Sequence, residues 1–300
     1  MNAGNAGSDV VVNRTASQLR TNGGLARIIA AAAAAGGARL HETNDLEDLE
    51  HVARDIAARG SDTVVLAGGD GSYMAGLSAL SRAYGPRALP RVALAPGGTV
   101  CTVARNLGMR GRARPWAERV IRAACDATTR TASHPTLRVR DDGGGDRVGF
   151  IFGAGLVARF FDAYYEAPRP GRAAAASLVA RIFVGSFAGG RLAETVLRPT
   201  RAVLKIDGAV HPARDWNLVL ASVVRDVGLH MLVPYRAGEE NERFHLVASG
   251  LAARALARQL PRVLAGKPLG GEPRVDTLAR ALRVAFEGTG GSYVLDGDKF

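Results

Sequence analysis

Two glycine-rich turns follow short apolar runs in the first third of the chain, and this pattern is typical of a phosphate-binding site. Residues 68–72 (Gly-Gly-Asp-Gly-Ser) follow the run 64–67, and residues 96–99 (Pro-Gly-Gly-Thr) follow the run 92–95. Glycine lets the backbone approach a ligand closely, and free amides at the start of a helix attract an anion. If both runs are strands of one parallel sheet, both turns lie at its carboxyl edge, where such folds bind ligands.

Asp70 makes the first turn chemically informative. A carboxylate beside a phosphate is repelled unless a metal ion such as Mg²⁺ bridges them or the carboxylate accepts a proton during a reaction. The simpler interpretation is a tight turn in which Asp70 caps the following helix. A second glycine turn, one strand–helix unit later, favours the phosphate site over the plain turn.

Alternating strands and helices in the first 130 residues must position these turns. Their pattern predicts strands at 10–12, 63–67 and 92–95, and helices at 25–35, 45–59, 73–84, 100–107 and 116–125. Such alternation with short turns favours a parallel sheet covered on both faces. The predicted fold class is therefore α/β, with a parallel-sheet nucleotide-binding domain at the N-terminus.

The pattern changes near Arg130. Short β-type runs dominate from there to Val247, with a helical stretch between Phe160 and Arg191, and a further helix is predicted over residues 251–264. We therefore expect a second, β-rich and sandwich-like domain that binds the acceptor. The expected division is an α/β domain over residues 1–130, a β-rich domain over 131–286, and a last segment, 287–300, that returns to the cleft of the first domain.

With these motifs in place, the sequence resembles the diacylglycerol kinase catalytic domain family, which includes bacterial lipid kinases and the sphingosine and ceramide kinases. The spacing of the motifs matches over nearly the whole chain, although the middle matches only in its general pattern. The resemblance rests on residues 68–72 and 96–99, on 104–108 (Ala-Arg-Asn-Leu-Gly), on 11–13 (Val-Val-Asn) and on 296–298 (Asp-Gly-Asp).

The resemblance implies an ATP-dependent lipid kinase that transfers the γ-phosphoryl group of ATP to a lipid hydroxyl such as that of diacylglycerol. Asp70 would act as a catalytic carboxylate and Mg²⁺ ligand beside the attacking hydroxyl, and Asp298 would return a second catalytic carboxylate to the cleft between the domains. The other matching positions would hold the nucleotide: Asn13, Gly68, Gly69, Gly71, Ser72, Gly97, Gly98 and Thr99.

The sequence also departs from the family pattern. The family continues Gly-Thr-x-Asn-Asp-Phe, whereas this chain has Cys101 and Thr102 in place of Asn-Asp, and Asp298 stands where the family has Glu. These changes leave a second hypothesis open, a nucleotide- or lipid-binding relative that has lost catalysis. A third hypothesis is a soluble sugar kinase or NAD kinase, because those enzymes share the first glycine turn.

Composition describes a globular protein with a cationic surface. The chain has 300 residues, 47% hydrophobic and 22% charged, and a net charge of +11 that comes almost wholly from arginine. The excess suits an anionic partner such as a nucleotide, an acidic membrane surface or nucleic acid, or it reflects a genome of high GC content, which inflates Arg and Ala. No nucleic-acid-binding motif is present, so we expect no nucleic-acid partner.

Cysteine usage and hydropathy predict a cytoplasmic protein that contacts the inner membrane face at most peripherally. The two cysteines, Cys101 and Cys125, are too few for a disulfide framework, and no signal peptide or spanning run is visible. Cys101 is either a reactive thiol at a helix start or a small buried residue.

An aromatic group with nearby arginines could contact a bilayer or line the second domain's core: Phe160, Phe161, Tyr164 and Tyr165, with Arg159, Arg169 and Arg172.

Overall fold

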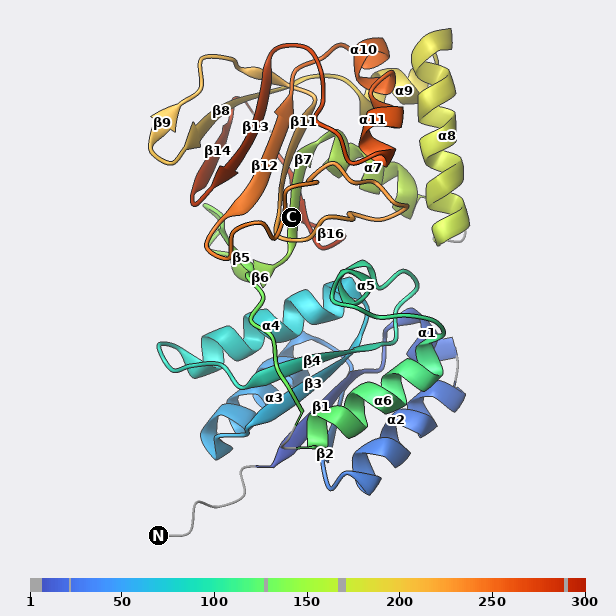
Figure 1. Cartoon of the computed structure of the whole chain (residues 1–300), viewed down its shortest axis with the longest axis vertical. Helices are drawn as coiled ribbons and strands as arrows, with labels where there is room; N and C mark the ends of the chain where they lie inside the picture. Colours follow the sequence, from blue (N-terminus) through green and yellow to red (C-terminus); the bar gives the residue numbers. More distant parts are fainter. Residues whose placement is uncertain (1–6, 22, 127–128, 167–170, 289–290) are drawn as a thin grey trace. The chain divides into compact units, whose positions relative to one another are not determined.

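The computed structural model describes residues 7–21, 23–126, 129–166, 171–288 and 291–300 (Figure 1). It contains two compact units, which are described separately. Unit 1 comprises Met1–Ser133 and Arg138–Gly149, and unit 2 comprises His134–Leu137 and Phe150–Phe300. In the described part of the chain, no helix is long and apolar enough to cross a membrane.

Unit 1 is built on a parallel sheet of order β2-β1-β3-β4. The strands are β1 (Ser8–Asn13), β2 (Arg39–Thr43), β3 (Thr63–Gly68) and β4 (Arg91–Pro96). Every residue of β3 is buried, as expected for a central strand covered on both faces. The parallel α/β sheet predicted from the sequence is therefore confirmed.

Two pairs of helices cover the two faces of this sheet (Figure 1). The helices of unit 1 are α1 (Ser17–Thr21), α2 (Gly23–Ala35), α3 (Leu46–Arg59), α4 (Asp70–Tyr84), α5 (Thr102–Asn106) and α6 (Ala113–Cys125). Helices α2 and α6 pack on the face that carries Val10, Val12, Val65 and Ala67. On the other face α4 comes so close that a Cβ on Gly76 would lie 2.8 Å from the Leu66 side chain.

Unit 2 is rich in antiparallel strands, which confirms the predicted β-rich region. Six strands form a sheet of order β13-β12-β11-β7-β15-β16, and β8, β9, β10 and β14 form a second sheet. Their bounds are β7 (Ile151–Gly155), β8 (Thr200–Ile206), β9 (Ala209–Val210), β10 (Asp215–Trp216), β11 (Leu218–Ser222), β12 (Phe244–Ser249), β13 (Arg274–Ala279), β14 (Leu282–Phe286), β15 (Tyr293–Leu295) and β16 (Asp298–Lys299). The hairpin of β5 (Leu137–Arg140) and β6 (Asp146–Gly149) precedes these strands in the chain but, apart from Leu137, belongs to unit 1.

The helices of unit 2 gather at one side of its sheets (Figure 1). They are α7 (Leu156–Tyr165), α8 (Arg172–Ala188), α9 (Arg191–Val196), α10 (Ala253–Ala257) and α11 (Leu260–Leu264). The single helix predicted over residues 251–264 is two short helices, because Pro261 takes an early position in α11, where the missing N–H of proline is tolerated. Residues 291–300 belong to unit 2, since β15 pairs with β7 and β16 with β15. The return of residues 287–300 to the first domain stays a prediction.

A buried carboxylate fixes the amino end of β1 in unit 1. Asp9 is fully buried and accepts hydrogen bonds from Ser61 Oγ and from Arg59 Nη2 at 3.0 Å, and it pairs with His41 Nε2 at 2.7 Å. Burial by itself raises the pKa of Asp9, but the hydrogen bonds to His41 and Ser61 and the charge of Arg59 lower it overall. The ionised form is therefore the one that the folded protein stabilises.

Replacing Asp9 with asparagine should lower the free energy of unfolding by about 1–3 kcal/mol at neutral pH, because one carboxylate oxygen becomes an NH₂ group and the donors that faced it lose their acceptor. A depressed folded pKa contributes stability above the unfolded pKa of about 3.9, and this contribution is lost as pH falls through the folded value. Hydrogen exchange of the β1 and β3 amides at pH 7 and pH 3 checks both points. A difference between Asp9→Asn and wild type that is as large at pH 3 as at pH 7 would contradict the assignment.

Candidate functional site

The two glycine turns lie against each other at the carboxyl edge of the parallel sheet. The amides of Gly97 and Gly98 both donate to the carbonyl oxygen of Gly68, at 2.6 and 3.0 Å. A Cβ on Gly98 would lie 2.4 Å from the Cα of Gly69, closer than any side chain allows. Gly69 and Gly98 are therefore required by a backbone-to-backbone contact. The amides of Gly97 and Gly98 are used in this contact, and a nucleotide-binding role of the two residues stays a prediction.

The start of α4 offers backbone donors to an anion. Gly69 is the N-cap in an extended conformation, and the first-turn amides that follow it have no acceptor within the helix. Those of Gly71 and Ser72 sit at the positive end of a 15-residue helix. An anion bound here would be held by backbone amides and the helix dipole together.

Asn13 and Ser72 connect the ends of β1 and β3. Asn13 Nδ2 donates to Ser72 Oγ at 2.9 Å, and the amide of Gly69 donates to the same oxygen at 3.3 Å. Asn13 Oδ1 in turn accepts from the amide and the hydroxyl of Thr15, at 2.9 and 2.7 Å. Asn13 is thus held in one orientation by its own turn, with the serine hydroxyl fixed beside the first turn of α4.

Asp70 caps a helix, but not the helix that it begins. Its Oδ2 accepts the amide of Thr102 at 2.8 Å, and its Oδ1 accepts the amide of Val103 at 2.9 Å. Both amides belong to the first turn of α5, so the carboxylate ties the second glycine turn to the first. Each carboxylate oxygen accepts more than one hydrogen bond, so Asp70 keeps acceptor capacity for a proton or a cation.

Cys101 precedes α5 in a left-handed conformation with a φ of +53°. Asparagine tolerates this conformation better than cysteine does, and asparagine is the residue of the resembled family at this position. The side chain is 3% exposed, and burial, with the charge of Asp70, raises the pKa of the thiol. The structure thus favours the small buried residue over the reactive thiol.

Ser17 is a member of the site that sequence reasoning missed. Its hydroxyl lies 2.7 Å from that of Thr99, and the neighbouring Gln18 amide donates to the Gly97 carbonyl at 3.0 Å. Helix α1 therefore holds the second glycine turn from the side of β1. The local sequence signal for Ser17 is a serine at the start of a helix, four residues after Asn13. Serine is common at helix starts, so this signal does not single out a site residue.

No group of three or more His, Cys, Asp or Glu side chains that could hold a metal ion occurs among the described residues. Mg²⁺ that is bound together with a nucleotide is held mostly by phosphates and water, with one or two protein carboxylates. Asp70 is the carboxylate at the glycine turns that could fill this place.

The last predicted carboxylate, Asp298, lies in unit 2 on the exposed strand β16. The buried carboxylate of the Asp-Gly-Asp motif is Asp296, which accepts the amide of Phe150 at 3.0 Å and that of Ile151 at 2.8 Å. Asp296 therefore anchors the start of β7, a role that its sequence did not reveal. A joint site of Asp70 and Asp298 stays a prediction, since the two residues belong to different units.

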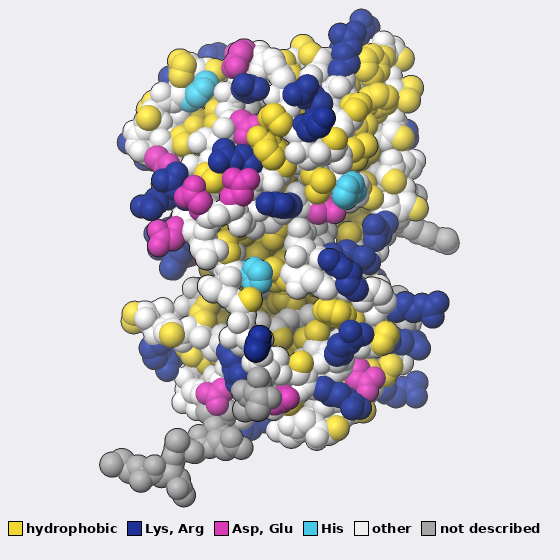
Figure 2. Space-filling view, in the orientation of Figure 1, with side chains coloured by type: hydrophobic (Ala, Val, Ile, Leu, Met, Phe, Trp, Pro, Cys, Tyr) yellow, Lys and Arg dark blue, Asp and Glu magenta, His cyan; other side chains and the backbone are white. Residues whose placement is uncertain are grey.

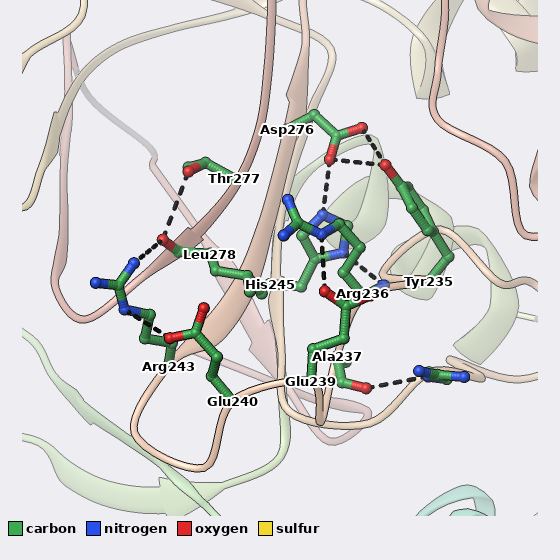
Figure 3. A network of polar contacts seen from close by, with 11 residues as sticks. Tyr235, Arg236, Ala237, Glu239, Glu240, Arg243, His245, Asp276, Thr277 and Leu278 are labelled. Carbon is green, nitrogen blue, oxygen red and sulfur yellow. Dashed lines mark hydrogen bonds and ion pairs between the residues drawn. The ribbon is translucent and has the colours of Figure 1, made fainter.

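Unit 2 also contains a polar network around a fully buried histidine (Figure 3). His245 Nδ1 accepts the amide of Arg236 at 3.3 Å, so its Nε2 carries the proton and donates to Asp276 at 2.8 Å. The Tyr235 hydroxyl donates to the same carboxylate at 3.1 Å, and burial together with Asp276 raises the pKa of Tyr235. Both nitrogens of His245 are engaged, so the network anchors the segment before β12 to β13 and offers neither a base nor a metal ligand.

The aromatic group of α7 is divided between core and surface. Phe160 and Tyr164 pack in the cluster formed with α8 and α9, whereas Tyr165 is 53% exposed and donates to the Gly297 carbonyl at 2.9 Å. Arg159 donates to the Val196 carbonyl at 3.0 Å, and burial, with the charge of Arg198, lowers its pKa to about 10. Phe160, Tyr164 and Arg159 therefore serve packing in unit 2, whereas Tyr165 lies at its surface. Arg169 lies outside the described residues.

Solved structures share the whole fold. A structure of a diacylglycerol kinase from Bacillus anthracis str. Sterne matches with a TM-score of 0.62 and 14% identity, covering 98% of this chain and 90% of that chain. Two proteins from the same organism that are proposed to be diacylglycerol kinases match with TM-scores of 0.66 and 0.65, at 17% and 15% identity, covering 98% of this chain and 90% and 89% of theirs. At these identities the likeness establishes the fold.

Comparison by sequence identifies the site-bearing part of the chain. No curated protein matches the sequence. The family model described as the diacylglycerol kinase catalytic domain matches residues 9–134, a range that holds both glycine turns, Asn13, Asp70 and α5. The resemblance inferred from the glycine turns is therefore confirmed over residues 9–134, the part of the chain that is similar to the diacylglycerol kinase catalytic domain.

Proposed function

We propose that the protein is an ATP-dependent lipid kinase that transfers the γ-phosphoryl group of ATP to a lipid hydroxyl such as that of diacylglycerol. The family and the fold indicate a phosphotransferase. The observation that carries the proposal is the packing of two glycine turns at one sheet edge, with open amides at the start of α4 and the Asp70 carboxylate beside them. The enzyme would work from the cytoplasm at a membrane surface, where its acceptor resides.

In the proposed reaction the chain supplies position and charge. The first-turn amides of α4 and the Ser72 hydroxyl bind phosphate oxygens, and the Gly69–Gly98 contact sets the shape of the cradle. Asp70 accepts the proton of the attacking hydroxyl with an oxygen that α5 already orients. Mg²⁺, arriving with ATP, would neutralise charge on the phosphates beside Asp70.

Phosphoryl transfer to a panel of acceptors tests the proposal. Radiolabelled ATP is offered with diacylglycerol, sphingosine or ceramide in mixed micelles, and with NAD or fructose 6-phosphate in solution. We expect label in a lipid product, and EDTA should abolish it. Label in NAD or in a sugar phosphate, with none in lipid, would show that the acceptor is water-soluble and the proposal wrong.

A second candidate is a nucleotide-binding relative without catalysis. Thr102 stands where the resembled family has a carboxylate, and its amide is one of the two that Asp70 accepts. The site therefore has one carboxylate fewer than the family pattern to hold a cation. Calorimetric binding of ATP without any phosphorylated product across the panel would favour this candidate.

A further inference from the structure

Helix α8 of unit 2 is apolar on nearly its whole circumference. Its 17 residues, Arg172–Ala188, include no Asp or Glu. One face packs into the core of unit 2 through Leu178 and Ile182, beside α7 and α9. A helix that is apolar all round is normally buried on every side, and α8 is not, because it runs along the edge of its unit (Figure 1).

The opposite face of α8 is an exposed apolar stripe. Its members recur every three or four residues, which places them on one side of the helix: Ala173, Ala176, Ala180, Val184 and Phe187. Val184 is 63% exposed and Phe187 is 38% exposed. Figure 2 shows hydrophobic side chains gathered along this edge of the molecule. We call these five residues the α8 stripe.

Cations border the stripe. Arg172 and Arg181 on α8 and Arg191 at the start of α9 are exposed, and Arg181 and Arg191 also line a shallow hollow of about 540 Å³ between α8 and α9. Glu194 on α9 is the one acidic residue in the sequences of these two helices. An exposed apolar stripe with arginines along its border is the pattern of a helix that lies in a membrane interface.

The arginines that border the stripe favour a bilayer over a second copy of the chain as its partner. A two-fold contact through the stripe would place the three arginines of one copy against those of the other, with a single glutamate per copy to offset them. Anionic lipid headgroups would pair with the same arginines while the acyl region receives Val184 and Phe187.

We propose that the α8 stripe is the surface by which this protein lies on an anionic lipid bilayer. Val184 and Phe187 enter the boundary of the acyl region, and Arg172, Arg181 and Arg191 bind lipid phosphates. The inference rests on the proposed function in one respect, that a lipid acceptor would require the protein to reach a bilayer. Vesicle binding itself does not depend on phosphoryl transfer.

Co-sedimentation with vesicles tests the docking surface without any kinase assay. Wild-type chain should sediment with phosphatidylglycerol–phosphatidylcholine vesicles and much less with pure phosphatidylcholine. The variant Val184→Ser/Phe187→Ser should partition about tenfold less. The variant Arg172→Gln/Arg181→Gln should lose the preference for anionic vesicles. The controls exchange other exposed residues away from α8, Leu46→Ser/Val210→Ser and Arg280→Gln/Arg283→Gln, and should bind as wild type does.

Two outcomes would overturn the proposal. One is vesicle binding that the α8 variants do not weaken relative to the controls. The other is a dimer in sedimentation velocity that Val184→Ser/Phe187→Ser dissociates, which would make a second copy the partner of the stripe. Failure of the kinase proposal alone would give another result: the protein would still bind vesicles through α8 but would transfer no phosphoryl group to lipid.

Discussion

Replacing Asp70 with asparagine is expected to lower phosphoryl transfer by about 10²–10⁴-fold, the usual contribution of a positioned proton acceptor. The structure adds a second effect. The asparagine amide would keep one acceptor for the two amides of α5 and would turn an NH₂ group toward the other. We expect a loss of about 1–2 kcal/mol in stability, because a half-buried donor is left without its partner.

The two effects are separated by a matched variant at the other end of the same sheet. Asp9→Asn also removes a carboxylate that orders unit 1, but Asp9 lies at the amino end of β1, whereas the turns lie at the carboxyl ends of β3 and β4. Activity is compared per folded molecule, with the folded fraction taken from urea unfolding. Equal specific activity in Asp70→Asn and Asp9→Asn would remove Asp70 from the chemistry and leave it a helix cap.

Strands β1, β3 and β4 could be predicted because they are short apolar runs, which a sheet covered on both faces demands. The polar edge strand β2 (Arg39–Thr43) was not predicted, because its sequence carries no such run. The two turns could be predicted for a related reason. Glycine has few other uses directly after a buried strand and before a helix, so residues 68–72 and 96–99 stand out. The sequence could not show that the amides of Gly97 and Gly98 are hydrogen-bonded within the protein.

Long-range contacts account for what could not be predicted. Asp70 was expected either to meet a ligand or to cap its own helix, and its actual partners lie 32 and 33 residues further along the chain. Asp296 is joined to residues 145 and 146 positions earlier. Local periodicity carries no information at such separations, so the sequence drew attention to Asp298 of this motif and gave no sign of the structural role of Asp296.

The backbone conformation at Cys101 shows what the departure from the family pattern changes. The sequence shows a lost amide side chain, whereas the structure shows a left-handed residue that asparagine would adopt with less strain. The cysteine keeps the turn because its Sγ lies in the core, 3.5 Å from the carbonyl oxygen of Gly98. The substitution therefore changes what surrounds Asp70 without breaking the contact between the turns.

Replacing Gly98 with alanine is expected to have the other large effect, a loss of ATP affinity of about tenfold or more. The new Cβ would lie 2.4 Å from Gly69 Cα and 3.1 Å from Gly69 N, so the turns must separate. Overpacking of this kind costs about 1–3 kcal/mol, and about 1.4 kcal/mol is tenfold in a binding constant. Calorimetric titration with ATP measures the affinity, and thermal unfolding measures the stability.

Gly23→Ala is the matched control, because a Cβ at Gly23 meets nothing within 4 Å and alanine is favoured over glycine in α2. It should bind ATP as wild type does and unfold at the same or a slightly higher temperature. If Gly98→Ala also bound ATP with wild-type affinity, the contact between the turns would not shape the nucleotide site. The amides of α4 would then have to hold the phosphates unaided, and the second glycine turn would serve only to cross over from β4 to α5.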